Sequence, residues 1–240
     1  MSKMNHELQA ALAHVAVKQP AAQGLPDAAH TIGRVGIVGA NPAGIGIAMS
    51  LLDADIPVTV FELTKQVLDV AIAQARSAYH MAVEQGGLAA AARDRRMALL
   101  AGSINFHHLK DCDVVIDALA TDSGTKARLF RKLDQTARPG AILVSCVSPG
   151  AVDRLAASTR RAGEVVGLQL SCPAQVGQTW TLVPGTASAG QALATLIALV
   201  QHLGKACVVA GDLGGDASQA GALQRGEEGA MPWRVDQIVE

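Results

Sequence analysis

Two glycines, an asparagine and a glutamate early in the chain have the types and the spacing needed to hold a dinucleotide. Gly39 and Gly44 are the first and third glycines of a turn that resembles G-x-G-x-x-G, and Asn41 takes the place of the second glycine. Such a turn opens a helix whose free N–H groups can bind a pyrophosphate. Glu62 follows roughly 20 residues later, where a carboxylate can accept hydrogen bonds from the adenosine ribose. This acid favours NAD over NADP, because a 2′-phosphate would meet its negative charge.

The residues around this turn predict the elements that would position it. Apolar residues at 35–38 and 58–61 predict two buried strands, and an apolar helix is expected from Ile45 to about Leu52. The first strand would bring the glycine turn to the edge of a sheet, and the second would end next to the glutamate. This order of strand, turn, helix, strand and acid is typical of a dinucleotide-binding unit.

Two residues of the turn leave a second interpretation open. Asn41 carries a Cβ at the position where glycine normally lets the backbone approach the pyrophosphate. Pro42 lacks a backbone N–H that could face the phosphate. We expect the cofactor to contact Gly39, Asn41, Pro42, Ala43 and Gly44. The alternative is an α/β unit whose nucleotide site is weakened or lost.

The length allows one large α/β domain or two small ones, and the composition argues against nucleic-acid and membrane partners. The chain has 240 residues, of which 50% are hydrophobic and only 2% aromatic, so its core must be built mainly from aliphatic residues. The formal net charge of −1 gives no basic excess for nucleic acid or an anionic membrane. No apolar run reaches the roughly 18 residues of a membrane span, and the N-terminus does not have the pattern of a signal peptide.

The four cysteines are widely spaced, at 112, 146, 172 and 207, and match no metal motif. We therefore expect reduced thiols in a cytoplasmic protein, and no metal site.

The rest of the chain alternates strands with helices, which predicts a doubly wound, mostly parallel sheet flanked by helices. Thr64 and Ser123 are candidate N-caps of two of these helices. We assign residues 31–212 to one dinucleotide-binding domain, 1–30 to an N-terminal appendage and 213–240 to a Gly-rich tail. Further helices are expected at 88–100, 151–160 and 188–202, and further strands at 103–106, 113–116, 141–144, 164–170, 180–183 and 206–210.

The order of these motifs resembles the NAD-binding domain of the L-3-hydroxyacyl-CoA dehydrogenases, from about residue 33 to residue 212. Besides the glycine turn, the segments that carry the resemblance are 45–48, 111–118, 126–130, 141–145, 166–168 with Pro173, and 203–205. The resemblance implies a Rossmann-like fold, NAD as the cofactor, and an oxidoreductase of fatty-acid and acyl-CoA metabolism. An acyl-CoA is the second ligand that it implies.

The resemblance also implies roles for individual residues. Glu62 matches the acid that binds the ribose, and Ala118 joins the expected cofactor contacts. Lys126 matches a lysine near the nicotinamide, and Ser148 matches a serine that contacts both substrate and nicotinamide. Taken alone, Lys126 could equally be an exposed helix lysine, and Ser148 a turn residue before Pro149.

The catalytic positions depart from the family pattern. Gln169 stands where the family has a histidine as general base, and Thr181 stands where the family has the glutamate that orients it. Glutamine can orient an oxygen but cannot take its proton near neutral pH. Because a dyad acts as a unit, losing both members predicts loss of the standard acid–base mechanism. Three further departures are Thr121 for an acid near the nicotinamide, and Cys146 and Cys172 for two asparagines.

Two histidines and two cysteines are candidate replacements for the missing base. His107 and His108 follow a predicted strand on the adenosine side, and we expect them to be exposed loop residues too far from the nicotinamide. Cys146 and Cys172 both follow strand ends. They are interpreted as small buried residues that replace asparagine, with a redox or nucleophilic thiol pair as the alternative.

The family's helical C-terminal domain has no counterpart in the Gly-rich residues after Asp212. The expected protein partners are a second copy of the chain in a homodimer, or a partner chain that supplies the missing helical domain. We interpret the chain as a 3-hydroxyacyl-CoA-dehydrogenase-like NAD-binding protein without the family's standard mechanism. The alternatives are a non-catalytic NAD(H) sensor or assembly subunit, and an interaction module that has lost nucleotide binding.

Overall fold

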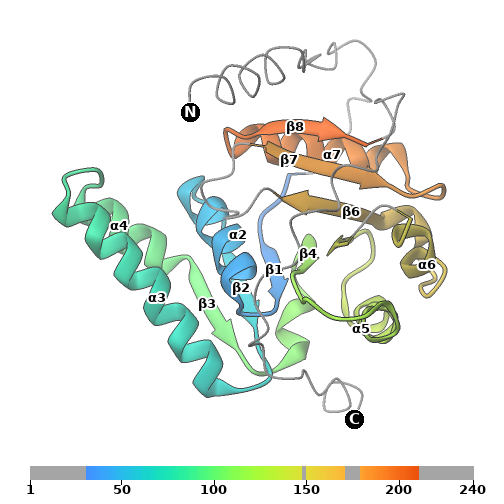
Figure 1. The fold of residues 1–240 in the computed structure, drawn as a ribbon, viewed down its shortest axis with the longest axis horizontal. Helices are drawn as coiled ribbons and strands as arrows, with labels where there is room; N and C mark the ends of the chain where they lie inside the picture. The colour runs from blue at the N-terminus through green and yellow to red at the C-terminus, as the bar shows by residue number, and fades with distance from the viewer. Residues whose placement is uncertain (1–30, 148–149, 171–178, 211–240) are drawn as a thin grey trace, which may run out of the picture.

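A computed structural model describes residues 31–147, 150–170 and 179–210. These residues contain an eight-stranded sheet in the order β3-β2-β1-β4-β5-β6-β7-β8 (Figure 1). The strands pair in parallel, except that β7 runs antiparallel to β6. The predicted doubly wound, mostly parallel α/β fold is therefore confirmed. The strands are β1 (Val35–Val38), β2 (Val58–Phe61), β3 (Leu100–Ser103), β4 (Val114–Asp117), β5 (Ile142–Cys146), β6 (Val165–Leu170), β7 (Thr179–Pro184) and β8 (Ala206–Val209).

Helices pack on both faces of the sheet because successive strand residues point to opposite sides. In β1, Val35 and Ile37 enter one hydrophobic cluster and Val38 enters the other. The first cluster contains residues of α2 (Pro42–Asp53), α3 (Lys65–Glu84) and α7 (Gly190–His202). The second contains residues of α5 (Ser123–Thr136) and α6 (Val152–Ala156). No helix within the described ranges is long and apolar enough to cross a membrane.

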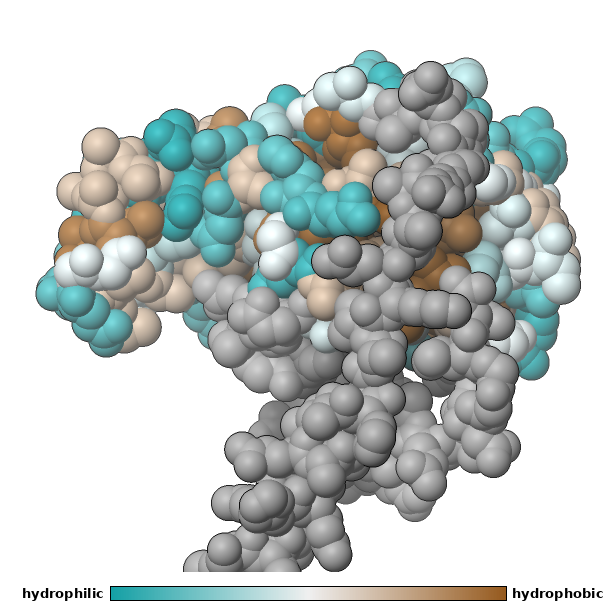
Figure 2. Space-filling model, turned by 90° about the horizontal axis from the view of Figure 1, so that it is seen from above, coloured by the Kyte–Doolittle hydropathy of each residue, from teal (hydrophilic) through white to brown (hydrophobic). Residues whose placement is uncertain are grey.

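The helices α3 and α4 (Ala90–Ala98) form a hairpin that protrudes from the body of the molecule in both Figure 1 and Figure 2. Its base is bonded to the carboxyl end of α2. The hydroxyl of Tyr79 donates to Asp53, which also pairs with Arg96 at 3.1 Å. Arg95 pairs with Asp55 just beyond the end of α2. The outer surface of the hairpin includes three exposed apolar side chains, Val67, Val70 and Met81.

Several predicted element boundaries are wrong. Helix α2 begins at Pro42 and not at Ile45, because the fixed φ of proline suits the first helical position. The strand expected at 103–106 lies at Leu100–Ser103, in register with β2, so α4 ends at Ala98. The helix expected at 151–160 is only five residues long.

The two predicted N-caps have different outcomes. Asp122, and not Ser123, caps α5, and its Oδ1 accepts hydrogen bonds from the N–H groups of Gly124 and Thr125. Thr64 does occupy the N-cap position of α3, but its side chain makes no capping hydrogen bond. The appendage 1–30 and the tail 213–240 lie outside the described residues.

Two 3₁₀-helices complete the described elements. They are η1 (Phe106–Leu109) and η2 (Ala162–Glu164). The strand order places the change of direction between β1 and β4, because the chain moves outward from β1 through β2 to β3 and then returns to start β4 on the other side of β1. Ligands of open α/β sheets bind in the crevice at the carboxyl ends of the strands at such a point.

Candidate functional site

The glycine turn that follows β1 enters this crevice, and two of its residues must be glycine. Gly39 has a φ of +106°, a region that other residues rarely adopt. A Cβ on Gly44 would lie 2.1 Å from the carbonyl oxygen of Gly39, which no packing adjustment can accommodate. The first and third glycines of the motif therefore have the geometric roles that a dinucleotide turn requires, a tight turn and close packing of helix on strand.

Asn41, at the second glycine position, adopts an unstrained backbone and caps α2. Its φ is −75°, and its Oδ1 accepts a hydrogen bond of 2.9 Å from the N–H of Gly44. Its Nδ2 donates a hydrogen bond of 2.7 Å to the carbonyl oxygen of Ala118, on the loop after β4. The side chain thus bridges the two loops that border the crevice.

Glu62, directly after β2, faces the glycine turn. Its Oε2 accepts a hydrogen bond of 3.1 Å from the N–H of Ala40, and its Oε1 accepts one of 2.7 Å from the N–H of Leu63. The side chain is buried, and burial raises its pKa above the ordinary value although these backbone hydrogen bonds act to lower it. An ionised carboxylate has about four acceptor positions. The backbone N–H groups do not use all of them, so acceptor capacity remains for ribose hydroxyls.

Lys126 is buried, so the interpretation of it as an exposed helix lysine is wrong. Its ammonium is buried and lies 2.6 Å from Oδ2 of Asp117, at the end of β4. The hydroxyl of Ser145, at the end of β5, donates to the same oxygen at 2.7 Å and lies 3.4 Å from the ammonium. Oδ1 of Asp117 accepts the N–H of Leu119 at 3.0 Å. The crevice wall thus contains a closed, buried polar cluster.

Asp117 and Ser145 were not among the residues predicted for the site. The available signal was a charged residue that closes the apolar run at 114–117, because an acid at the end of a buried strand needs a partner. Lys126, nine residues further along, was the nearest cation on the following helix.

A cavity of about 510 Å³ lies beside this cluster at the carboxyl ends of β4 and β5. Its walls include Thr121, Lys126, Cys146 and Arg154. Oγ1 of Thr121 is buried and has no hydrogen-bond partner among the residues that the structure describes. The cavity can therefore take a polar ligand beyond the crevice, on the side where the resemblance places the nicotinamide.

The structure brings Gln169 and Thr181 together. They are paired directly across the antiparallel strands β6 and β7, and both side chains are half-buried. Paired positions of this kind have Cβ atoms roughly 5 Å apart, so the two side chains can contact each other. Neither has a proton that titrates near neutral pH. The neighbouring Trp180 is buried, and its indole N–H has no acceptor within the described ranges.

The remaining candidate residues are separate from this arrangement or cannot be placed. His107 and His108 lie on η1 after β3 and are exposed, as expected, and Nδ1 of His108 is 2.8 Å from the hydroxyl of Ser103. Ser148 and Cys172 lie outside the described residues, so the thiol pair stays a prediction. Burial raises the pKa of the Cys112 and Cys207 thiols to about 11, which makes both poor nucleophiles.

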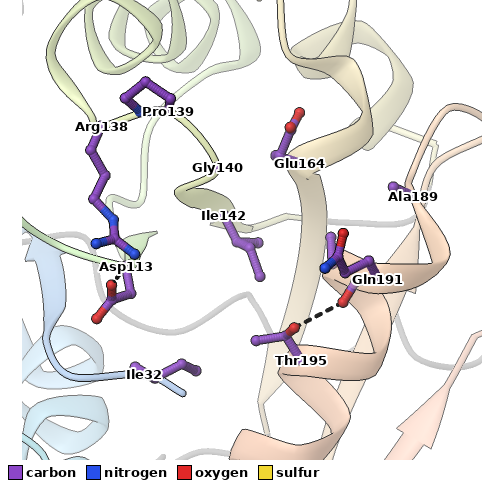
Figure 3. A pocket seen from close by; sticks show the side chains of 11 residues that line it. Ile32, Asp113, Arg138, Pro139, Gly140, Ile142, Glu164, Ala189, Gln191 and Thr195 are labelled. Carbon is purple, nitrogen blue, oxygen red and sulfur yellow. Dashed lines mark hydrogen bonds and ion pairs between the residues drawn. The ribbon is translucent and has the colours of Figure 1, made fainter. Parts of the chain in front are cut away.

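A second, smaller cavity of about 160 Å³ lies at the opposite edge of the sheet (Figure 3). Asp113 and Arg138 form an ion pair on one side of it, and Thr195 donates to the backbone oxygen of Gln191 on the other. Its charged residues precede the strands β4, β5 and β6, whereas the glycine turn and Glu62 follow β1 and β2. This cavity is therefore not part of the cofactor crevice.

Comparison with known proteins identifies one family. The family described as "3-hydroxyacyl-CoA dehydrogenase, NAD binding domain" matches residues 34–213. A peroxisomal bifunctional enzyme of Danio rerio is 31% identical over 213 residues, which are 85% of this chain and 29% of that protein. A 3-hydroxybutyryl-CoA dehydrogenase of Mycobacterium tuberculosis is 33% identical over 146 residues, which are 60% of this chain and 51% of that protein.

Solved structures agree with these sequence matches. The crystal structure of M. tuberculosis FadB2 is 31% identical, with a TM-score of 0.72, and the match covers 75% of this chain and 64% of that one. The (S)-3-hydroxybutyryl-CoA dehydrogenase PaaH1 of Ralstonia eutropha is 26% identical, also with a TM-score of 0.72, and the match covers 75% of this chain and 63% of that one. The chain thus spans 29% and 51% of the two curated relatives named above, and slightly less than two thirds of these two structures.

Proposed function

Because the chain belongs to the 3-hydroxyacyl-CoA dehydrogenase family and matches its NAD-binding domain, we propose that it binds NAD(H) in the crevice between β1 and β4. The observation that carries this proposal is the contact of Glu62 with the glycine turn. The carboxylate is held on the N–H of Ala40 and keeps acceptor positions for the adenosine ribose. The pyrophosphate would lie at the amino end of α2, where the N–H of Ala43 has no acceptor among the described residues.

The nicotinamide half of the cofactor would enter the cavity beside Lys126. The hydroxyl of Thr121, which has no partner among the residues that the structure describes, would offer it a hydrogen bond. The charge of Lys126 is already balanced by Asp117. When bound, NAD supplies hydride transfer. The protein's own contribution is to bind and orient this cofactor.

We propose further that the second ligand is an acyl-CoA, as the names of the relatives suggest, and that its turnover is slow. In the family pattern Gln169 and Thr181 occupy the positions of the general base and of the residue that orients it. A paired glutamine and threonine can hold a hydroxyl or carbonyl oxygen, but they cannot move its proton. A positioned general base typically contributes about 10²–10⁴-fold to a rate. The same pair favours a second candidate, an NAD(H) sensor or assembly subunit without turnover.

Calorimetric titration of the whole chain with NADH tests the first proposal. We expect saturable binding that is lost in Glu62→Ala and kept in the control Glu164→Ala, because Glu164 lines the cavity at the opposite edge of the sheet. Absence of binding in protein shown to be folded by circular dichroism would refute NAD(H) binding.

Addition of acetoacetyl-CoA to the NADH complex then separates the two candidates. Slow oxidation of NADH would favour the dehydrogenase, and binding without oxidation would favour the sensor or assembly subunit. Size-exclusion chromatography with light scattering would show whether the chain forms a homodimer.

A further inference from the structure

The Asn41 side chain lies where a dinucleotide's pyrophosphate would approach the protein. In a dinucleotide turn the second position is glycine so that the backbone can come close to the phosphates. Here Oδ1 of Asn41 accepts a hydrogen bond from the N–H of Gly44, one of the amide groups that have no partner within α2. Nδ2 of Asn41 closes the other side of the crevice by donating to the oxygen of Ala118.

The same side chain reduces the hydrogen bonds that the amino end of α2 can offer to an anion. The first three helical positions are Pro42, Ala43 and Gly44. Pro42 has no N–H, and the N–H of Gly44 is already bonded to Asn41. Ala43 is therefore the only one of these three residues whose backbone N–H has no acceptor among the residues that the structure describes. A pyrophosphate therefore meets one free donor where the helix could present two.

We propose that Asn41 is a latch on the cofactor crevice. Its carboxamide takes the place of the pyrophosphate, and NAD(H) binds only when this side chain turns away and breaks both of its hydrogen bonds. This inference rests on the proposed binding of NAD(H) and adds how the affinity is set. The latch lowers the affinity without abolishing binding, because its displacement frees the N–H of Gly44 for the phosphates.

The expected size of the effect follows from the two hydrogen bonds. Both are neutral and of ordinary length, 2.9 and 2.7 Å, and each such bond contributes modestly because water can replace it. We expect their removal to tighten NADH binding by about tenfold, which corresponds to about 1.4 kcal/mol.

Three variants at Asn41 test the latch by calorimetric titration of the full chain with NADH. Asn41→Gly removes both the latch and the Cβ, and a glycine N-cap costs a helix only a few tenths of a kcal/mol compared with asparagine. Asn41→Ala removes the latch and keeps the Cβ. Asn41→Asp keeps an acceptor for the N–H of Gly44 but cannot donate to Ala118, and it brings a negative charge to the phosphates.

The matched control is Ser188→Gly. The hydroxyl of Ser188 accepts the N–H of Gly185 at 2.8 Å and donates to the carbonyl oxygen of Val165 at 2.6 Å, so it also bridges two segments by one accepted and one donated hydrogen bond. Val165 begins β6, at the edge of the sheet opposite the glycine turn. Any general effect of losing such a bridge would appear in this control as well.

We expect tighter binding in Asn41→Gly and Asn41→Ala, weaker binding in Asn41→Asp, and no change in Ser188→Gly. Equal affinity of the wild type and Asn41→Gly would overturn the latch while leaving NAD(H) binding in place. Tighter binding in Asn41→Gly without any change in Asn41→Ala would also overturn it, because the Cβ and not the carboxamide would then limit affinity. If none of the folded proteins binds NADH, the proposed function fails and the latch fails with it.

Discussion

Replacement of Lys126 by methionine should strongly destabilise the fold, because it leaves a buried carboxylate without its cation. Asp117 is fully buried and Lys126 nearly so, with 2.6 Å between their charged atoms. At this distance and an effective dielectric constant of about 20, Coulomb's law gives an attraction of about 6 kcal/mol. Most of that attraction offsets the desolvation of the two charges, so the pair adds little net stability. Removal of one partner leaves the desolvation uncompensated and typically costs about 3–5 kcal/mol.

The prediction extends to a double-mutant cycle. In Lys126→Met/Asp117→Asn, the amide of the new asparagine can accept the N–H of Leu119 and donate to Ser145, so a neutral hydrogen-bonded cluster replaces the ion pair. We expect this double variant to recover most of the stability lost in either single variant, with a coupling free energy of at least about 2 kcal/mol. Lys65→Met is the control, because the Lys65–Asp69 pair is exposed and contributes about 0–1 kcal/mol.

The assay is urea unfolding followed by circular dichroism, with the free energy of unfolding extrapolated to zero denaturant. The free energy of unfolding of such a domain is about 5–15 kcal/mol. The loss in each single variant is therefore large enough to measure, or it leaves the variant unfolded. A loss below about 1 kcal/mol in Lys126→Met would refute the reasoning, because Asp117 would then not need its cation. A double variant as unstable as the sum of the single variants would also refute it.

Three further predictions concern the glycine turn, Glu62 and the strand pair. Gly44→Ala should cost at least about 1–3 kcal/mol in urea unfolding and abolish NADH binding, whereas Gly190→Ala, whose Cβ meets open space, should change neither. Because burial raises the folded-state pKa of Glu62 above 4.5, the stability of the wild type relative to Glu62→Gln should fall as the pH rises from 4.5 through that raised value. A flat difference across this pH range would contradict the prediction. Gln169→His/Thr181→Glu should raise the rate of acetoacetyl-CoA reduction at least about tenfold, because it places an imidazole beside a carboxylate, and an unchanged rate in folded, NADH-binding protein would show that proton transfer is not what limits turnover.

The sequence predicted those parts of the fold and the site that depend on neighbouring residues. Gly39 and Gly44 could be recognised because their roles follow from a short motif and from the backbone of one turn. Glu62 could be expected at the end of β2 because an apolar strand runs directly into it. The order of strands and helices followed from periodicity in the same way, whereas the boundaries of α4, β3 and α6 depended on pairing and packing that no short window contains.

The features that could not be predicted join distant segments. The amide of Asn41 bonds to Ala118, 77 residues away, and nothing near Asn41 in the sequence indicates that contact. Lys126 resembles a surface lysine of a charged helix until β4 and β5 bring Asp117 and Ser145 against it. The register that places Gln169 opposite Thr181 depends on the antiparallel direction of β7, which the alternation of strands and helices does not reveal.

The position of Trp180 gives the protein a built-in optical reporter. The chain has two tryptophans, at positions 180 and 233, so Trp233→Phe would leave one emitting indole. Trp180 is 1% exposed and lies next to Thr181 on β7. An indole in such dry surroundings emits at shorter wavelengths than one in water. Loss of the native packing would therefore shift its emission to longer wavelengths. Bound NADH would instead quench the emission by energy transfer. Unfolding and cofactor binding can thus be followed in one sample by two distinct changes in the spectrum.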